Sequence, residues 1–295
     1  MASAEDDNGR LTLMAVHAHP DDEVFGTGGV FACAAALGMR TALVTATRGD
    51  VGEIHDPDLD PEEARERLAA IREEELRRAC AILGIGELYF LGYRDSGMVD
   101  TPDNDDPRNF HNADPDAATG RVVELMRRVR PDVVITYDAR GGYGHPDHIA
   151  AHRATVAAFD AAGDPDCYPE QGLPPWRPRK LYYTAFPRSG LLRMRDELRA
   201  RGVVLPFPGS DTEDFDPSSF TVPDEDITTR VDVGVYVGQK RAALQAHRTQ
   251  IGAEHFTQLL PEDLARQMLG TETFTRVRSL VPAALPEDDL FAGLR

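Results

Sequence analysis

Apolar residues occur along residues 1–186 as short runs that alternate with longer stretches of helical spacing. Short runs bounded by turn-forming residues are typical of buried strands. Apolar positions three and four apart are typical of amphipathic helices, and the longest such stretch stops at Gly84, a residue type that commonly ends helices. In chain order the pattern predicts a strand at 11–16, a helix at 28–39, a strand at 41–47, a helix at 61–83, a strand at 87–91, a helix at 115–129, a strand at 132–137, a helix at 147–162 and a strand at 181–186.

Strands that alternate with helices in this way form parallel sheets joined by right-handed crossovers. We therefore expect an α/β fold: a Rossmann-like, mostly parallel sheet with helices on both faces and the strand order 3-2-1-4-5. Open sheets of this kind bind ligands beyond the carboxyl ends of their strands, where the strand order reverses. The loops that follow the first and fourth strands should therefore face each other.

The alternation stops near residue 187. The Pro-, Asp- and Ser-rich stretch at 206–226 shows neither helical nor strand period and is predicted to be a loop or linker. Beyond it the spacing predicts a strand at 227–233, an amphipathic helix at 237–250 and a shorter helix near 261–269. We expect residues 1–186 to form the Rossmann-like domain and residues 187–295 to form a smaller C-terminal lobe that completes a binding cleft.

Composition narrows the class of protein. The chain has 295 residues, near the upper limit for one hydrophobic core, and a net charge of -18. Such an acidic surface repels phosphate backbones and anionic headgroups, so neither nucleic acid nor a membrane is expected as a partner. No stretch approaches the ~18 apolar residues of a membrane helix, and the acidic segment at 1–10 lacks the features of a secretory signal. We expect a cytoplasmic protein.

The cysteines exclude one kind of metal site. Cys33, Cys80 and Cys167 are widely spaced and none belongs to a CxxC pair, so neither a disulfide framework nor a thiolate zinc site is supported. Histidine and carboxylate side chains would have to hold any metal ion.

Two polar segments stand directly after predicted strands: HAHPDDE at 17–23 and GGYGHPDH at 141–148. A catalytic metal site takes three protein ligands, such as imidazole nitrogens and a carboxylate oxygen, and leaves one position open. His19, Asp22 and His148 fit this count, because His and Asp three residues apart can turn to the same side at the start of a helix. We predict that these three residues hold a divalent metal ion.

The other polar residues of these segments suit proton transfer. Bound zinc lowers the pKa of its water to about 7, and a nearby carboxylate can take the proton. We predict that Asp21 is this general base. His145, in its protonated form, would stabilise an oxyanion or protonate a leaving amine, and Asp147 would orient His145. The combination predicts a metal-dependent hydrolase.

The same segments resemble a known family. AHPDDE after a first strand and HPDH after a later one are similar to the LmbE-like, or PIG-L, superfamily of metal-dependent N-deacetylases. Three further segments, YRDSGM at 93–98, TYDARGGYGHPDHIAAH at 136–152 and KRAALQAHRTQI at 240–251, resemble the branch of mycothiol deacetylases and mycothiol conjugate amidases. This resemblance covers most of the chain.

Carried over by motif, the resemblance places the metal ligands of the family on His19, Asp22 and His148. It places the general base on Asp21 and the second catalytic histidine on His145. These positions agree with the assignment from the residues alone.

The resemblance also implies further contacts and an activity. Tyr143 would be a mobile oxyanion contact, and Arg72 and Asp95 would bind hydroxyl groups of a sugar or inositol ring. The implied cofactor is Zn²⁺, with Fe²⁺ as an alternative hydrolytic metal. The implied reaction removes the N-acetyl group from a small N-acetylglucosaminide, such as N-acetylglucosaminyl inositol.

Three alternative functions stay open at this point. A mycothiol S-conjugate amidase would use the same machinery, although the loops at 94–98 and 143–148 are closer to the deacetylase form than to VDSGL and YPHPDH. A non-hydrolytic nucleotide-binding Rossmann protein is disfavoured, because the glycine fingerprint and its acidic partner are not in place. A non-haem Fe(II) oxygenase would also use two histidines and one carboxylate, but it gives no role to Asp21.

The remaining histidines receive structural interpretations. His17 and His152 are predicted to have packing or hydrogen-bonding roles. His111, His247 and His255 lack partners at ligand spacing, so we expect solvated or capping roles for them.

Overall fold

The computed structural model describes the chain except residues 1–8, 206–208, 213, 253–254, 256 and 258–259. Most of the acidic segment at 1–10, and parts of the loop predicted at 206–226, therefore lie outside the described residues. Among those that are described, no helix is both long enough and apolar enough to cross a bilayer.

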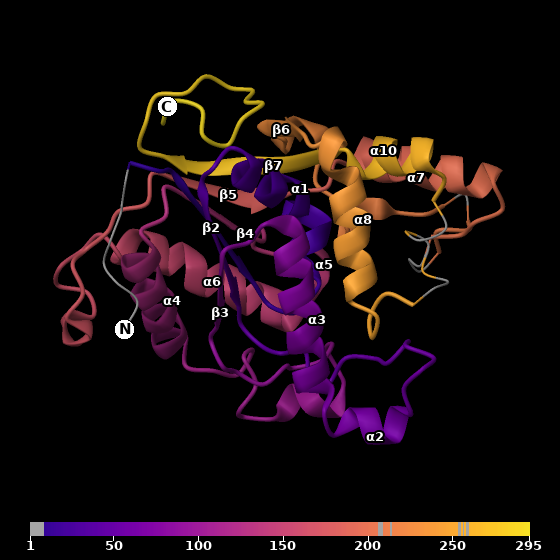
Figure 1. Cartoon of the computed structure of the whole chain (residues 1–295), viewed down its shortest axis with the longest axis horizontal. Coiled ribbons are helices and arrows are strands. Elements are labelled where there is room, and N and C mark those ends of the chain that lie inside the picture. The colour runs from indigo at the N-terminus through magenta and orange to yellow at the C-terminus, as the bar shows by residue number, and fades with distance from the viewer. Residues whose placement is uncertain (1–8, 206–208, 213, 253–254, 256, 258–259) are drawn as a thin grey trace.

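One sheet of seven strands forms the centre of the molecule (Figure 1), in the order β3-β2-β1-β4-β5-β7-β6. The first five strands are parallel and confirm the predicted order 3-2-1-4-5, whereas β7 and β6 extend the sheet as antiparallel strands. The strands are β1 (Thr12–His17), β2 (Arg40–Thr45), β3 (Glu87–Phe90), β4 (Val133–Thr136), β5 (Lys180–Thr184), β6 (Thr229–Asp232) and β7 (Thr271–Ser279).

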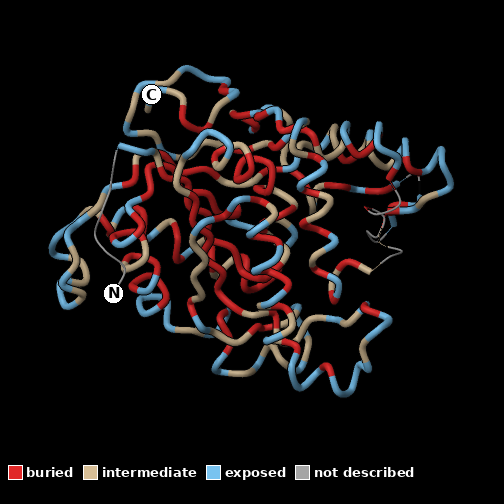
Figure 2. The backbone as a smooth tube through the Cα atoms, viewed as in Figure 1, coloured by how far each residue is buried: buried red, intermediate tan, exposed pale blue. Residues whose placement is uncertain are grey.

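Helices cover both faces of the sheet, as predicted. They are α1 (Asp22–Ala36), α2 (Pro61–Arg65), α3 (Leu68–Leu83), α4 (Pro115–Val129), α5 (Gly141–Gly144), α6 (Pro146–Ala161), α7 (Arg188–Ala200), α8 (Val237–Ala246) and α10 (Glu262–Leu269). Alternate residues of β1 point to opposite faces of the sheet. Leu13 and Ala15 pack with α1, α3 and α8, whereas Met14 and Val16 pack with α4 and α6. Figure 2 shows that the buried residues concentrate in these central strands.

Two predicted helices differ from the observed ones. The helix predicted at 28–39 begins earlier, because Asp22 and Glu23 already form the first turn of α1. The helix predicted at 61–83 is divided into α2 and α3, since the backbone of Arg67 leaves helical geometry with φ -118° and ψ 8°.

Residues beyond 187 add two strands to the central sheet and also form a further group of helices. Strands β6 and β7 continue the central sheet, and α8 packs against α1 and α3. Helices α7 and α10 share an apolar cluster of their own, which includes Leu191, Leu198, Leu264 and Ala265. Strands β6 and β7 and helix α8 are therefore joined to the first part of the chain, and a separate C-terminal lobe stays a prediction.

Candidate active site

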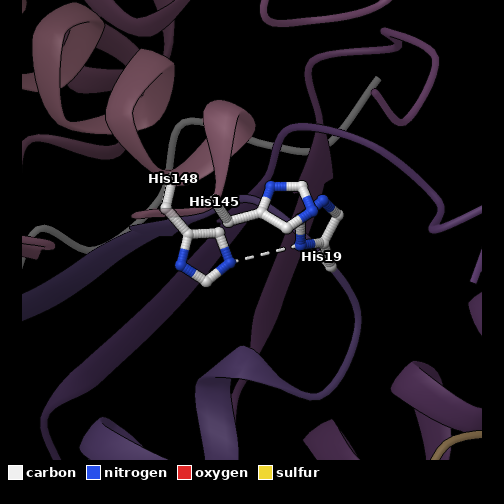
Figure 3. A group of neighbouring side chains, drawn as sticks. All are labelled: His19, His145 and His148. Atoms are coloured by element: carbon white, nitrogen blue, oxygen red, sulfur yellow. Dashed lines mark hydrogen bonds between the residues drawn. The ribbon is translucent and has the colours of Figure 1, made fainter. Parts of the chain in front are cut away.

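The site lies at the carboxyl ends of β1 and β4, which are neighbouring parallel strands. The loop after β1 carries His19 and leads into α1, whose first residue is Asp22. The loop after β4 leads through α5 to His145, which precedes α6, and His148 lies in the first turn of α6. Sequence-distant segments therefore meet where the strand order reverses, as predicted. Figure 3 shows the three histidine rings converging, with His148 and His19 joined by a dashed line.

The side chains of the three predicted metal ligands form a tight group, in which both Asp22 oxygens lie near the facing ring nitrogens. His19 Nδ1 lies 3.3 Å from His148 Nε2, His148 Nε2 lies 3.3 Å from Asp22 Oδ1, and His19 Nδ1 lies 3.5 Å from Asp22 Oδ2. Zinc bonds to nitrogen and oxygen are about 2.0–2.2 Å long, so neighbouring ligand atoms of a tetrahedral site lie roughly 3.3–3.5 Å apart. The spacing of His19, Asp22 and His148 fits a tetrahedral zinc site.

The other ring nitrogens point to acceptors outside this group. His148 Nδ1 lies 3.1 Å from the carbonyl oxygen of Gly141, and His19 Nε2 lies 3.2 Å from Asp147 Oδ2. Each of these nitrogens carries the ring proton if it donates to its oxygen neighbour, which leaves the two facing nitrogens unprotonated. Metal-binding histidines are commonly oriented by such acceptors.

Tyr137 supports Asp22 and was not recognised from the sequence. Its hydroxyl donates to Asp22 Oδ2 at 2.7 Å and accepts the backbone N–H of Ala18 at 2.8 Å. Its ring stacks on His148 at 4.2 Å between centroids. The one sequence signal was its position at the end of the strand predicted at 132–137.

Replacing Tyr137 by Phe should weaken metal binding while the fold is retained. The ring would still stack on His148, but Asp22 would lose the hydroxyl that fixes its carboxylate. We expect about a 10- to 100-fold lower affinity for Zn²⁺, measured by competition with a chelator. Tyr183→Phe is a suitable control, because Tyr183 packs edge-on against His152 and not against the ligand group. Unchanged affinity in Tyr137→Phe would show that the hydroxyl does not orient Asp22.

Two other groups of side chains could also hold a metal ion. The first consists of His19, His145 and His148, and the second of His19, Asp95 and Asp147. Asp147 Oδ1 is buried and has no hydrogen-bond partner among the described residues. His19 belongs to both groups, so the chemistry of the donors supports metal binding at this place.

Asp21 occupies an unusual backbone position directly before α1. Its φ of 106° and ψ of -29° lie in the left-handed region, which costs a non-glycine residue about 1–3 kcal/mol. Burial raises the pKa of Asp21 to about 6, although the neighbouring Arg72 acts in the opposite direction. A carboxylate with a pKa near neutrality suits a general base.

Arg72 is next to Asp21, and its side chain is buried, with 3% of the residue exposed. Its guanidinium donates to the carbonyl oxygens of Pro20 at 2.6 Å and Gly49 at 2.9 Å, and it lies 3.4 Å from Asp21 Oδ2. These contacts of Arg72 are therefore with the loop that carries Asp21 and with Gly49 in the loop after β2. Binding of a substrate hydroxyl by Arg72 stays a prediction.

His145 caps the start of α6. Its Nδ1 accepts the backbone N–H of Asp147 at 3.2 Å, so a neutral ring carries its proton on Nε2. Burial, together with the neighbouring His19 and His148, lowers the pKa of His145 to about 2. A neutral ring held in this way can donate a hydrogen bond through Nε2–H, and the catalytic role expected of His145 stays a prediction.

Asp147 contacts His145 through its backbone N–H, and the expected role of its side chain in orienting His145 stays a prediction. The Asp147 carboxylate accepts the backbone N–H of Ser96 at 2.8 Å and lies against His19. Because Asp147 is in the first turn of α6, its backbone faces the His145 ring while its side chain turns the other way.

Asp95 and Tyr143 also border the site. Asp95 Oδ1 lies 3.4 Å from His19 Nε2 and accepts the backbone N–H of Gly97 at 2.9 Å. Tyr143 is 47% exposed, and its ring centroid lies 5.0 Å from that of His148. Gly142, with φ 72° and ψ -77°, gives this short turn a backbone conformation that other residues rarely adopt. The substrate roles of Asp95 and Tyr143 stay predictions.

The interpretation of His247 as solvated or capping is wrong. The helix predicted at 237–250 ends at Ala246, because the backbone of His247 turns to φ -87° and ψ 58°. His247 is completely buried, and its Nε2 lies 2.7 Å from Glu23 Oε1. By contrast, His17 and His152 form the expected structural hydrogen bonds, to Thr27 Oγ1 at 3.0 Å and to the carbonyl oxygen of Tyr137 at 2.9 Å.

Comparison with known proteins identifies the family. A family model described as PIG-L, GlcNAc-PI de-N-acetylase, matches residues 14–159. A 1D-myo-inositol 2-acetamido-2-deoxy-alpha-D-glucopyranoside deacetylase from Geodermatophilus obscurus is 44% identical over 96% of this chain and 97% of its own. The chain belongs to the PIG-L family. Membership favours amide hydrolysis over the oxygenase and nucleotide-binding alternatives.

Solved structures support the PIG-L fold. N,N'-diacetylchitobiose deacetylase from Pyrococcus horikoshii matches with a TM-score of 0.63 at 19% identity, over 90% of this chain and 84% of its own. A 4-carboxy-2-hydroxymuconate hydratase from Pseudomonas putida matches with a TM-score of 0.61 at 20% identity, over 93% of this chain and 99% of its own. Since a deacetylase and a hydratase share the architecture, the activity of a PIG-L protein must be argued from its site.

Proposed function

We propose that this PIG-L protein hydrolyses the acetamide of an N-acetylglucosaminyl inositol, releasing acetate and the free amino sugar. The observation that carries the proposal is the convergence of His19, Asp22 and His148, with the Asp21 carboxylate directly beside them in sequence. The Geodermatophilus relative, whose name gives this type of substrate, matches nearly the whole chain and adds support.

The ligand set favours Zn²⁺, because two imidazoles and one carboxylate at tetrahedral spacing are typical of catalytic zinc sites, although Fe²⁺ can use the same donors. When bound, such a cation acts as a Lewis acid and lowers the pKa of water to about 7. His19, Asp22 and His148 would hold it.

The residues around this group divide proton transfer and hydrogen bonding. Asp21 takes a proton from the attacking water as the new carbon–oxygen bond forms, and gives that proton to the amide nitrogen as the carbon–nitrogen bond breaks. The neutral His145 ring keeps its own proton and donates a hydrogen bond through Nε2–H to the reacting amide. The Tyr143 hydroxyl would donate to the carbonyl oxygen, on which negative charge develops.

The two parts of the chain would contribute different parts of the active site. Residues 1–186 supply the metal-binding catalytic groups, and residues 187–295 complete the cleft. We further propose that the protein acts in the cytoplasm on a small soluble amino sugar, with no nucleic acid or membrane partner. The net charge of -18 supports this proposal.

The nature of the acyl group provides the test of this function. A site shaped for acetyl leaves little room for the cysteinyl group of a mycothiol conjugate. We expect a kcat/KM for N-acetylglucosaminyl inositol roughly 10- to 200-fold above that for a bulky conjugate, the discrimination that one well-placed set of contacts provides. Competition between the two substrates, followed by mass spectrometry, measures this ratio.

Asp21→Asn protein serves as the control in this competition, because residual cleavage by it reports contaminating enzymes. Preferential cleavage of the conjugate would favour the amidase alternative. Failure to cleave either amide would overturn the proposed function.

A further inference from the structure

The peptide bond between Pro20 and Asp21 is held on both sides. Its carbonyl oxygen accepts the Arg72 guanidinium at 2.6 Å, and its N–H donates to Glu23 Oε2 at 2.9 Å. Rotation of this peptide unit would break both hydrogen bonds and swing the Asp21 side chain. The two contacts therefore keep Asp21 in its left-handed conformation, which a residue with a Cβ does not favour.

The Glu23 contact depends on a residue from the far end of the chain. Glu23 is completely buried, and its second carboxylate oxygen lies 2.7 Å from Nε2 of the completely buried His247. Burial alone would lower the pKa of His247, but the Glu23 carboxylate raises it above its ordinary value. A buried carboxylate without such a partner would turn toward another donor.

We propose that Glu23 and His247 are positioning residues for Asp21. The C-terminal segment delivers His247, His247 fixes the Glu23 carboxylate, and Glu23 fixes the peptide bond that aims the Asp21 side chain. This inference rests on the proposed function, in which Asp21 is the general base. It assigns a role in turnover to His247, which was interpreted from the sequence as solvated or capping.

A purely structural role would have a different signature. Thr249, two residues after His247, docks the same segment by donating its hydroxyl and its backbone N–H to Glu75 on α3, at 2.6 and 2.8 Å. If the segment only contributes stability, loss of either residue should lower the unfolding temperature and leave kcat unchanged. If His247 positions Asp21, loss of His247 should lower kcat as well.

Two amide substitutions of His247 show whether its hydrogen bond to Glu23 is enough or whether its positive charge is also needed. The side chain of His247→Gln can place an N–H near the former Nε2 position, whereas that of His247→Asn is too short to reach Glu23. We expect His247→Asn to lower kcat about 100-fold, the effect of a misaligned catalytic group. His247→Gln should stay within about fivefold of the original kcat, and Thr249→Val within about twofold. KM and the zinc content measured by elemental analysis should change less than about twofold in all three.

A double-mutant cycle with Asp21→Asn completes the test. When Asp21 is already lost, His247→Asn should cause no further loss of kcat, because residues that act as a unit are not additive. Additive losses, or equal kcat values for His247→Asn and His247→Gln, would overturn the positioning role while leaving Asp21 as the base. Full activity of Asp21→Asn alone would instead overturn the base assignment in the proposed function, and the positioning role with it.

Discussion

Replacing Asp21 by Asn should leave metal content unchanged and lower kcat about 10²- to 10⁴-fold, the usual contribution of a general base. Asn has nearly the same shape as Asp and can still accept a hydrogen bond from Arg72, so the fold of the loop should survive. What is lost is the ability to take a proton. Acetate release under saturating substrate, with elemental analysis of the same sample, measures both quantities.

Asp50→Asn is a matched control for this change. Asp50 is also near the site, and its carboxylate accepts the backbone N–H of Asp95 at 3.0 Å, but it lies outside the ligand group. We expect its kcat to fall far less than that of Asp21→Asn. Near-normal turnover in Asp21→Asn would mean that another group takes the proton.

Replacing His148 by Ala should remove metal and activity together. The substitution deletes one of the three donors of the predicted site, and the remaining pair, His19 and Asp22, cannot close a catalytic coordination shell. We expect zinc content after dialysis to fall well below one equivalent. Activity should fall in parallel and should return only partly when excess zinc is added.

His152→Ala provides the control on the same helix. His152 lies one turn after His148 on α6 and is hydrogen-bonded to the carbonyl oxygen of Tyr137, so its loss should affect stability more than metal content. If His148→Ala retains a full equivalent of zinc, the ligand assignment is wrong. One of the other two groups around His19 would then have to hold the ion.

The parallel part of the fold was predictable because its strands are apolar on both faces. Strand β7 was not predicted, because its buried face carries a charged residue. Its inward-facing Glu272 interrupts the apolar pattern, yet it is buried, where it pairs with Lys240 at 2.6 Å and accepts the backbone N–H groups of Gly29 and Val30. A buried charge satisfied by distant partners looks like a surface residue in the sequence.

The same distinction applies to the site. The convergence of His19, Asp22 and His148 could be predicted because they lie in segments that follow strands whose adjacency was itself predictable. The contact of Tyr137 with Asp22 and that of His247 with Glu23 depend on how helices and loops pack, which local spacing does not record. The direction of the Asp147 side chain was missed because it depends on the turn at the start of α6.

The wide separation of Glu23 and His247 has a consequence for biosynthesis. The two residues are 224 positions apart. At ribosomal rates of about 5–20 residues per second, the interval between their syntheses is roughly 10 to 45 seconds. Only in the last part of this interval does the nascent chain contain the sequence of the first five strands, and the edge of β5 that β7 later covers is then open to pairing with other chains. We therefore expect the nascent chain to expose an unpaired strand edge before its catalytic loop is complete, when it is most prone to aggregation.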